Sequence, residues 1–249
     1  MENKLIWLPE VGSTNTYCKE HFARLEDGWV VATASQTAGR GRLGRPWVNA
    51  AGLGLYYTLV IKRPLAQPST LPLLSSMAVQ AAVKECFGVE TAVKWPNDLL
   101  LGGKKLVGIL CEGIMPVAGQ AGGLISGIGV NLAQDQAYFD AMDLPHGTSL
   151  RLQGVAVDPE QDAPRMAAVM TAWFQNALPL FAEKGFAPFL DEYRKTCVNI
   201  GMPVTFDGGR GLALDVDADG NLVVETEGGQ KRVFTGEVSV KGIYGAVMP

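Results

Sequence analysis

Glycine and arginine alternate in one short segment of the chain. Residues 39–45 read Gly-Arg-Gly-Arg-Leu-Gly-Arg. Glycine lets the backbone approach a ligand closely, and a guanidinium donates paired hydrogen bonds to phosphate or carboxylate oxygens. The spacing therefore predicts a loop that binds a small anion, such as a nucleotide or a carboxylate.

The same segment fits the G-x-G-x-x-G pattern of dinucleotide-binding loops, but its context differs. Such a loop opens a helix and is followed by an acidic residue about 20 residues further on. Here the loop runs into Pro46, Trp47 and an expected strand, and no Asp or Glu occurs from Gly28 to Lys84. The glycines are not followed by the Lys-Ser or Lys-Thr of a Walker loop either. Both dinucleotide and Walker sites are therefore excluded.

The charge of the chain is unevenly distributed. Its 249 residues include 21 Lys and Arg and 25 Asp and Glu, for a net charge of −4. The acid-free block contains six cations, which are Arg40, Arg42, Arg45, Lys62, Arg63 and Lys84. An acidic remainder would repel a nucleic acid duplex, so the charge pattern argues against a nucleic-acid partner. A small-anion site and a solvated basic face are the two interpretations that remain.

Cysteine spacing and hydropathy narrow the class of protein further. The four cysteines, at positions 18, 86, 111 and 197, are too far apart for a zinc motif or a disulfide framework. No stretch approaches the roughly 18–20 apolar residues of a membrane helix, and the N-terminus lacks the apolar region of a signal peptide. The sequence predicts a cytoplasmic protein without a membrane partner.

Helical and strand patterns alternate through the first 196 residues. Ser13-Thr14-Asn15 is typical of a helix start, and Gly102-Gly103 is typical of a two-residue hairpin turn. Further helices are expected over residues 73–87, 165–184 and 187–196. Strands are expected over residues 29–34, 55–61, 98–101, 105–112 and 123–132, with a short strand ending at Trp95. Hairpin-linked strands mixed with helices predict an α+β fold with a mixed, largely antiparallel sheet.

The pattern changes after Cys197. Short strands are expected over residues 204–206, 210–216, 222–226 and 232–240, separated by turns at Asp219-Gly220 and Gly228-Gly229. Strands this short and closely spaced predict a small barrel of about 50 residues. We therefore expect two domains, residues 1–196 and residues 197–249.

Four motifs in this order resemble those of biotin protein ligases. They are Ser13-Thr14-Asn15, the Gly-Arg loop with Gln36 before it and Trp47 after it, Lys94-Trp-Pro-Asn-Asp98, and Gly127-Ile-Gly-Val-Asn-Leu132. Residues 105–110 also look like the family's strand after the hairpin. Leu43 departs from the pattern, because some members have another arginine there. Some members begin with a DNA-binding helix-turn-helix, and the first motif here falls at Ser13, so we expect the type without that domain.

The resemblance covers almost the whole chain and implies both a fold and a reaction. The fold is a catalytic domain similar to class II aminoacyl-tRNA synthetases, followed by an SH3-like β-barrel. The reaction joins biotin to ATP as biotinyl-5′-AMP and transfers it to a lysine of a biotin carboxyl carrier protein or domain of a biotin-dependent carboxylase. The resemblance further implies Mg²⁺ with the ATP, and it is compatible with a homodimer.

The resemblance also assigns roles to residues. The catalytic residues are expected to be Lys94 and Arg42. The biotin-binding residues are expected to be Ser13, Thr14, Asn15, Gln36, Arg40, Gly41, Arg42 and Lys94. The ATP- and adenylate-binding residues are expected to be Gly39, Arg40, Arg45, Trp47 and Asn131. No carboxylate cluster marks the magnesium ligands.

Several alternatives stay open at this point. A lipoate–protein ligase shares the fold and also forms an acyl-adenylate, and a non-catalytic, ligand-responsive regulator could use the same basic loop. Individual residues also have simpler interpretations. Ser13-Thr14-Asn15 could be a helix cap and nothing more. Lys94 could be a surface lysine at a strand end, and Trp47 could belong to the core.

Overall fold

A seven-stranded sheet forms the centre of the computed structural model, which describes residues 4–47, 50–116, 121–234 and 244. The strand order is β1-β2-β3-β7-β6-β5-β4. The strands are β1 Leu5–Trp7, β2 Val30–Thr33, β3 Gly54–Ile61, β4 Ala92–Lys94, β5 Asp98–Leu101, β6 Lys104–Ile114 and β7 Gly123–Asn131. The β1–β2 pair is parallel and the other neighbouring pairs are antiparallel. The expected mixed, largely antiparallel sheet is confirmed.

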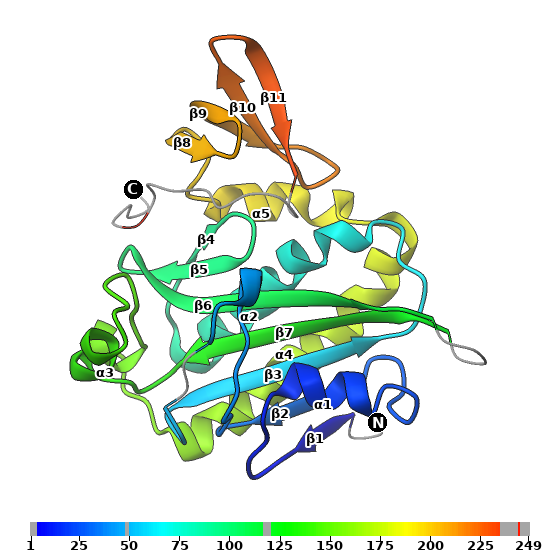
Figure 1. The fold of residues 1–249 in the computed structure, drawn as a ribbon, viewed down its shortest axis with the longest axis vertical. Helices are drawn as coiled ribbons and strands as arrows, with labels where there is room; N and C mark the ends of the chain where they lie inside the picture. The colour runs from blue at the N-terminus through cyan, green and yellow to red at the C-terminus, as the bar shows by residue number, and fades with distance from the viewer. Residues whose placement is uncertain (1–3, 48–49, 117–120, 235–243, 245–249) are drawn as a thin grey trace.

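Helices cover both faces of this sheet (Figure 1). The helices are α1 Thr14–Glu20, α2 Leu71–Phe87, α3 Gln136–Ala141, α4 Pro159–Lys184 and α5 Leu190–Thr196. Helices α2 and α4 bury the larger core against one face, whereas α1 packs on the other over a smaller apolar cluster that includes Cys18, Val31 and Val60. Within the described ranges, no helix combines the length and the apolar character needed to cross a membrane.

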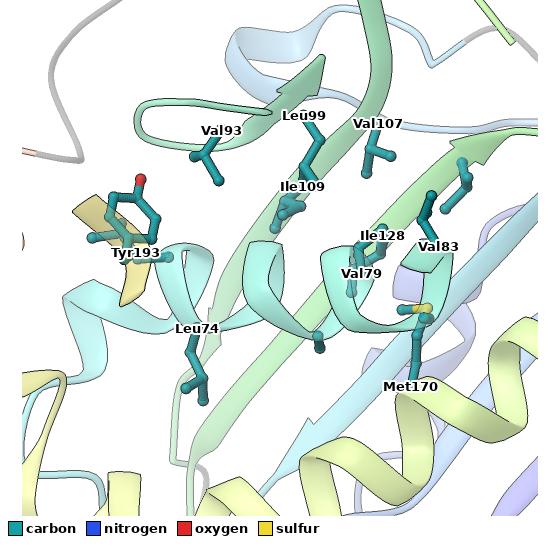
Figure 2. Close-up of a cluster of buried hydrophobic side chains, with 14 of the residues drawn as sticks. Leu74, Val79, Val83, Val93, Leu99, Val107, Ile109, Ile128, Met170 and Tyr193 are labelled. Atoms are coloured by element: carbon teal, nitrogen blue, oxygen red, sulfur yellow. The ribbon is translucent and has the colours of Figure 1, made fainter. Parts of the chain in front are cut away.

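The larger core joins the two helices to the strands that carry the site. Figure 2 shows Val79 and Val83 of α2 beside Ile128 of β7, with Met170 of α4 nearby and Leu74 on the opposite side of α2. Strand residues such as Val107 and Ile128 complete this cluster. These side chains are fully or almost fully buried, and burying one such chain stabilises the fold by about 1.5–3 kcal/mol. The sheet is therefore a rigid support for residues on its opposite face.

Local sequence signals predicted some element boundaries correctly and missed the start of α4. Helix α2 ends at Phe87 and is followed by Gly88 in the left-handed conformation, with φ +69°. Gly102 and Gly103 form the hairpin turn with φ +57° and +72°. Helix α4 was expected from position 165 but begins six residues earlier, at Pro159. Asp158 caps it by accepting a hydrogen bond from the Glu160 backbone N–H. Pro164 lies inside the helix, beyond its first turn, so the helix lacks one backbone hydrogen bond there.

Two short elements carried no clear signal. Strand β1 has only three residues and pairs in parallel at the sheet edge. Helix α3 has six residues and is capped by Asp135, which accepts a hydrogen bond from the Tyr138 backbone N–H at 2.8 Å. Elements this short lack the length over which hydrophobic periodicity becomes recognisable.

A second, four-stranded antiparallel sheet stands at one end of the molecule, beyond α5 (Figure 1). Its strands are β8 Pro203–Phe206, β9 Gly209–Val216, β10 Leu222–Thr226 and β11 Gly229–Val233. This architecture agrees with the small SH3-like barrel that we expected. The last strand was expected over residues 232–240 but begins at Gly229, because the turn closes tightly as Thr226 donates to the Gly229 carbonyl at 2.7 Å. Residues 235–240 of that expected strand lie outside the described residues.

Trp95 connects the two sheets. Its indole Nε1 donates to the Gly220 carbonyl at 2.9 Å, and its backbone N–H donates to Asn199 Oδ1 at 2.7 Å. Both partners belong to the C-terminal part of the chain. The segment that carries Lys94 is therefore held by hydrogen bonds to the loop before β8 and to the turn between β9 and β10.

Candidate active site

A cavity of about 420 Å³ opens on the face of the sheet that also carries α1. It brings together residues that are far apart in the sequence. The expected site residues that line it are Ser13, Thr14, Asn15, Gln36, Arg40, Gly41, Arg42, Arg45, Trp47, Lys94 and Asn131. They come from the start of α1, the loop after β2, and the ends of β4 and β7.

Gly39 is the expected site residue that does not line the cavity. Its carbonyl accepts a hydrogen bond from the Trp47 backbone N–H at 3.0 Å. A Cβ at this position would lie 2.4 Å from the Trp47 carbonyl oxygen. Gly39 therefore shapes the loop that carries the arginines, and its glycine is required by this close approach.

The start of α1 both caps the helix and lines the cavity. Ser13 Oγ accepts a hydrogen bond from the Thr16 backbone N–H at 3.4 Å. Thr14 donates to Gln36 Oε1 twice, from its backbone N–H at 2.8 Å and from its hydroxyl at 3.1 Å. The simple interpretation of this motif as a helix cap is therefore correct but incomplete.

Asn15 is held on two sides. Its Nδ2 donates to the Leu110 carbonyl at 3.2 Å and to Glu112 Oε2 at 2.9 Å, while the Thr58 hydroxyl lies 2.7 Å from its Oδ1. A Cβ at Gly127 would lie 2.1 Å from Asn15 Oδ1. The first glycine of the Gly127–Leu132 motif therefore makes room for the Asn15 amide.

Glu112 gathers charged partners at the same end of the cavity. Its Oε1 lies 2.6 Å from Lys19 Nζ and 3.0 Å from Arg40 Nη2. Burial would raise the pKa of Glu112, but hydrogen bonds from Lys19 and Asn15 and the nearby positive charges lower it below its ordinary value. The carboxylate is therefore ionised and links α1 to the Gly-Arg loop.

Trp47 lies against two glycines that face each other across the sheet. Gly108 of β6 pairs with Gly129 of β7. A Cβ at Gly108 would lie 2.4 Å from Trp47 Cζ3, and one at Gly129 would lie 2.6 Å from Trp47 Cε2. The indole Nε1 is buried and has no hydrogen-bond partner among the described residues. Gly129, the second glycine of the Gly127–Leu132 motif, therefore leaves room for the Trp47 indole against the sheet.

Two ammonium groups share one carboxylate at the other end of the cavity. Asp98 Oδ1 lies 2.7 Å from Lys105 Nζ, and its Oδ2 lies 3.8 Å from Lys94 Nζ. The Tyr244 hydroxyl donates to the same Oδ2 at 3.2 Å, and Lys94 Nζ lies 4.4 Å from the centre of the Tyr244 ring. Lys94 is therefore buried inside the site, which rules out the surface-lysine interpretation.

Burial lowers the pKa of Lys94 below its ordinary value. The charges of Lys105 and Arg42 lower it further, and the charge of Asp98 opposes both effects. Burial also lowers the pKa of Arg42, whose Nη1 donates to Asn97 Oδ1 at 2.6 Å. An arginine stays protonated in proteins, so this end of the cavity keeps an excess of positive charge.

The charge of the whole lining favours an anion. Among the described lining residues, five are cationic, namely Arg40, Arg42, Arg45, Lys94 and Lys105. Two are acidic, namely Asp98 and Asp143. A partly enclosed cavity with this excess attracts and holds negatively charged ligands. This agrees with the small-anion interpretation of the Gly-Arg loop.

Sequence reasoning missed several residues of the site. Asp98 was expected only as the end of the Lys94–Asp98 motif, without a role, and Lys105 only as part of a strand. Glu112 and Thr58 lie on strands behind the cavity wall, and the alternation along β6 could have placed Glu112 on the same face as Gly108. Tyr244 is 146 positions away from Asp98 in the chain, and no local pattern could have brought the two together.

The donor set does not suit a resident metal ion. In the part of the chain that the structure describes, no group of three or more His, Cys, Asp and Glu side chains could hold one. Asp98 already contacts two ammonium groups. Any magnesium would therefore be held mainly by the ligand's own oxygens.

Comparison with known proteins agrees with this fold and cavity. Residues 7–131 match the Biotin/lipoate A/B protein ligase family, and residues 200–241 match the Biotin protein ligase C terminal domain. The chain therefore belongs to the biotin/lipoate A/B protein ligase family. The second match places its C-terminal sheet with the biotin branch of that family, as the motifs had indicated.

Curated relatives and solved structures support the same assignment. The chain is 33% identical to "Biotin--[acetyl-CoA-carboxylase] ligase" of Mycobacterium tuberculosis, with 92% of this chain and 86% of that protein covered. It is 31% identical to "Bifunctional ligase/repressor BirA" of Bacillus subtilis, of which it spans 66%. The structure of biotin protein ligase from Aquifex aeolicus in complex with biotin and ATP is similar, with a TM-score of 0.78 at 28% identity, covering 97% of this chain and 99% of that one.

Proposed function

We propose that this protein activates biotin with ATP as biotinyl-5′-AMP and transfers the biotinyl group to a lysine of a biotin carboxyl carrier protein or domain. The observation that carries this proposal is the cavity itself. It joins a neutral, hydrogen-bonding end around Thr14 and Gln36 to a cation-rich end around Lys94 and Asp98. The solved relative that holds biotin and ATP has the same fold over almost its whole length.

The chemistry requires two displacements. A carboxylate oxygen of biotin attacks the α-phosphorus of ATP, and the bond to the pyrophosphate oxygen breaks. The acceptor amine then attacks the carbonyl carbon of the mixed anhydride, and AMP leaves with the electron pair of the C–O bond. The amine has an ordinary pKa of about 10.4, so it must lose a proton before or during its attack.

The neutral end suits the bicyclic ring of biotin. Its cyclic urea has two N–H donors and one carbonyl acceptor. We assign its recognition to Ser13, Thr14, Asn15 and Gln36, which line this end. Buried polar groups need partners of the opposite kind, since one left unpaired costs about 1–3 kcal/mol.

The cation-rich end suits the reacting groups. Arg42 lies at this end beside Asn97, whereas Arg40 of the same loop reaches Glu112 near Asn15. We assign both arginines, with Gly41 between them, to the carboxylate and phosphate of the ligand. Lys94 stabilises the negative charge that develops on the transferring oxygens, and removal of one such preorganised donor costs about 10²–10³ in rate. Lys105 shares Asp98 with Lys94 at shorter range, so we include it in the same role.

The remaining lining residues suit the nucleotide. We assign Arg45, Trp47 and Asn131 to ATP and the adenylate, with Gly39 holding the loop in shape behind Trp47. Lys105 Nζ lies 5.6 Å from the centre of the Trp47 ring, which places a cation beside the indole surface. We expect Mg²⁺ to accompany ATP, where it would neutralise part of the phosphate charge.

The proposal extends to the organisation of the chain. We infer that residues 1–196 form the catalytic domain and residues 197–249 the SH3-like barrel. A cytoplasmic location and a homodimer remain parts of the proposal, and sedimentation of the purified protein would measure its oligomeric state. No nucleic-acid or membrane partner is part of the proposal.

Mass spectrometry of a carrier domain tests the function directly. The protein is incubated with biotin, ATP, Mg²⁺ and a biotin-accepting carrier domain, in parallel with the Lys94→Ala and Lys105→Ala variants. We expect a biotin-sized mass gain on the carrier, much slowed in both variants. A gain only with lipoate and its own carrier would instead identify a lipoate–protein ligase. No gain with either pair would favour the non-catalytic regulator.

A further inference from the structure

The orientation of the Asn15 amide is fixed by two acceptors. Both hydrogens of Nδ2 are used, one by the Leu110 carbonyl at 3.2 Å and one by Glu112 Oε2 at 2.9 Å. A carbonyl and an ionised carboxylate can only accept hydrogen bonds. The Nδ2 group must therefore face them, and Asn15 keeps only its Oδ1 for any partner on the cavity side.

Asn15 Oδ1 has one partner within the protein and one lone pair left for a ligand. The Thr58 hydroxyl lies 2.7 Å from Asn15 Oδ1 and 2.8 Å from Thr14 Oγ1, and it has one hydrogen to donate. The Thr14 backbone N–H already donates to Gln36 Oε1 at 2.8 Å, so the Thr14 hydroxyl can donate to Thr58, and Thr58 can donate to Asn15 Oδ1. An amide oxygen has two lone pairs, and Thr58 occupies one of those on Asn15 Oδ1.

We propose that Glu112 is a positioning residue that fixes Asn15 as a hydrogen-bond acceptor, so that this end of the cavity selects a ligand ring with an N–H donor. The inference rests on the proposed function and deepens it. The cyclic urea of biotin has N–H groups that can donate to the second lone pair of Asn15 Oδ1. The dithiolane ring of lipoate has no N–H and cannot form this additional hydrogen bond, which disfavours its binding.

Glu112→Gln tests this geometry without changing the size of the side chain. In the native protein, Oε1 serves Lys19 and Arg40 while Oε2 serves Asn15. One of the two atoms becomes an NH₂ group in the variant. The two cations hold the remaining oxygen, because charge-assisted hydrogen bonds are the stronger ones. The new NH₂ then faces Asn15 Nδ2, and this clash of two donors favours rotation of the Asn15 amide.

The readout is the ratio of kcat/KM for biotin to kcat/KM for lipoate, from ATP–pyrophosphate exchange. We expect Glu112→Gln to lower this ratio about tenfold, through a higher KM for biotin and with kcat nearly unchanged. Loss of the Arg40 contact alone would weaken both ligands alike, because both carry the same carboxylate. A change in the biotin-to-lipoate ratio of kcat/KM therefore reports on recognition of the ligand's ring and not on the Arg40 contact.

Lys19→Met is the matched control. It removes the Lys19–Glu112 ion pair but leaves the hydrogen bond from Asn15 to Glu112 intact. We therefore expect the biotin-to-lipoate ratio of kcat/KM to stay at its native value. An unchanged ratio in Glu112→Gln, or an equal change in Lys19→Met, would overturn the inference. Absence of biotin-dependent exchange in the native protein would overturn the proposed function instead, which keeps the two failures distinct.

Discussion

At one end of the cavity neutral amides and hydroxyls bond to one another, whereas at the other end two ammonium groups share one carboxylate. The Thr14–Gln36 pair has a donor-to-acceptor distance of 2.8 Å, whereas Lys94 lies 3.8 Å from Asp98. The first arrangement is internally well matched and suits recognition of a fixed shape. The second has an excess of charge that only an anionic ligand neutralises, which suits the stabilisation of a reacting phosphate.

The largest effect is expected from the charged end. Lys94→Ala and Lys105→Ala should each slow formation of biotinyl-5′-AMP by about 10²–10³-fold, because each removes a preorganised cation. The double variant should lose less than the product of the two, since both cations share Asp98. Single-turnover kinetics measure this. Full additivity would show that the two lysines act independently.

A smaller effect is expected where the sheet supports Trp47. In Gly129→Ala the new Cβ would lie 2.6 Å from Trp47 Cε2, so the indole must shift. The KM for ATP should rise about tenfold, as expected for overpacking of a well-filled site. Gly113→Ala on β6 is the control, since its Cβ would meet nothing within 4 Å. An equal KM for ATP in both variants would contradict a role for Trp47 at the nucleotide.

The pH dependence of adenylation should report on Lys94. Burial lowers the pKa of Lys94, and Asp98 opposes that shift. The rate should fall as the pH rises through this lowered pKa, because Lys94 then loses its charge. Asp98→Asn removes the opposing charge, so the fall should move to lower pH by about one unit. A pH–rate profile that does not move in Asp98→Asn would separate Lys94 from the rate-limiting step.

The smallest expected effect is on the free energy of unfolding, which should change differently when a residue is replaced at each end of the cavity. Thr58→Val removes a buried hydroxyl from the neutral cluster and should lower the free energy of unfolding by about 1 kcal/mol. Lys94→Met removes a buried charge whose partner Asp98 keeps Lys105, so the free energy of unfolding should stay the same or rise by about 1 kcal/mol. Urea denaturation measures both. A larger loss in Lys94→Met would mean that the charged end stabilises the fold.

The comparison also shows what the sequence could and could not reveal. Local signals located the helix cap at Ser13, the hairpin turn at Gly102-Gly103 and the end of α2 at Gly88, because each depends on neighbours in the chain. The glycines of the Gly127–Leu132 motif were recognisable as a motif. Glycine is needed there because the side chains of Asn15 and Trp47, from distant segments of the chain, pack against these positions.

The least predictable parts of the site depend on tertiary contacts. Lys105 and Asp98 meet across the β5–β6 hairpin, and Tyr244 reaches Asp98 from the C-terminal part of the chain. Likewise, the start of α4 at Pro159 depends on capping by Asp158, whereas the helix was expected from position 165. Propensity describes single elements, whereas a site built from segments far apart in the sequence depends on the whole fold.

The most direct test of the two-ended site measures binding and chemistry separately in two variants. For Gln36→Ala and Arg42→Ala, isothermal titration gives the Kd for biotin and single-turnover kinetics give the rate of adenylate formation at saturating biotin and ATP. We predict that Gln36→Ala raises the Kd at least tenfold and leaves the rate nearly unchanged. Arg42→Ala should mainly lower the rate, by about 10²-fold or more. If both variants change the Kd and the rate in the same proportion, recognition and chemistry are not divided between the two ends.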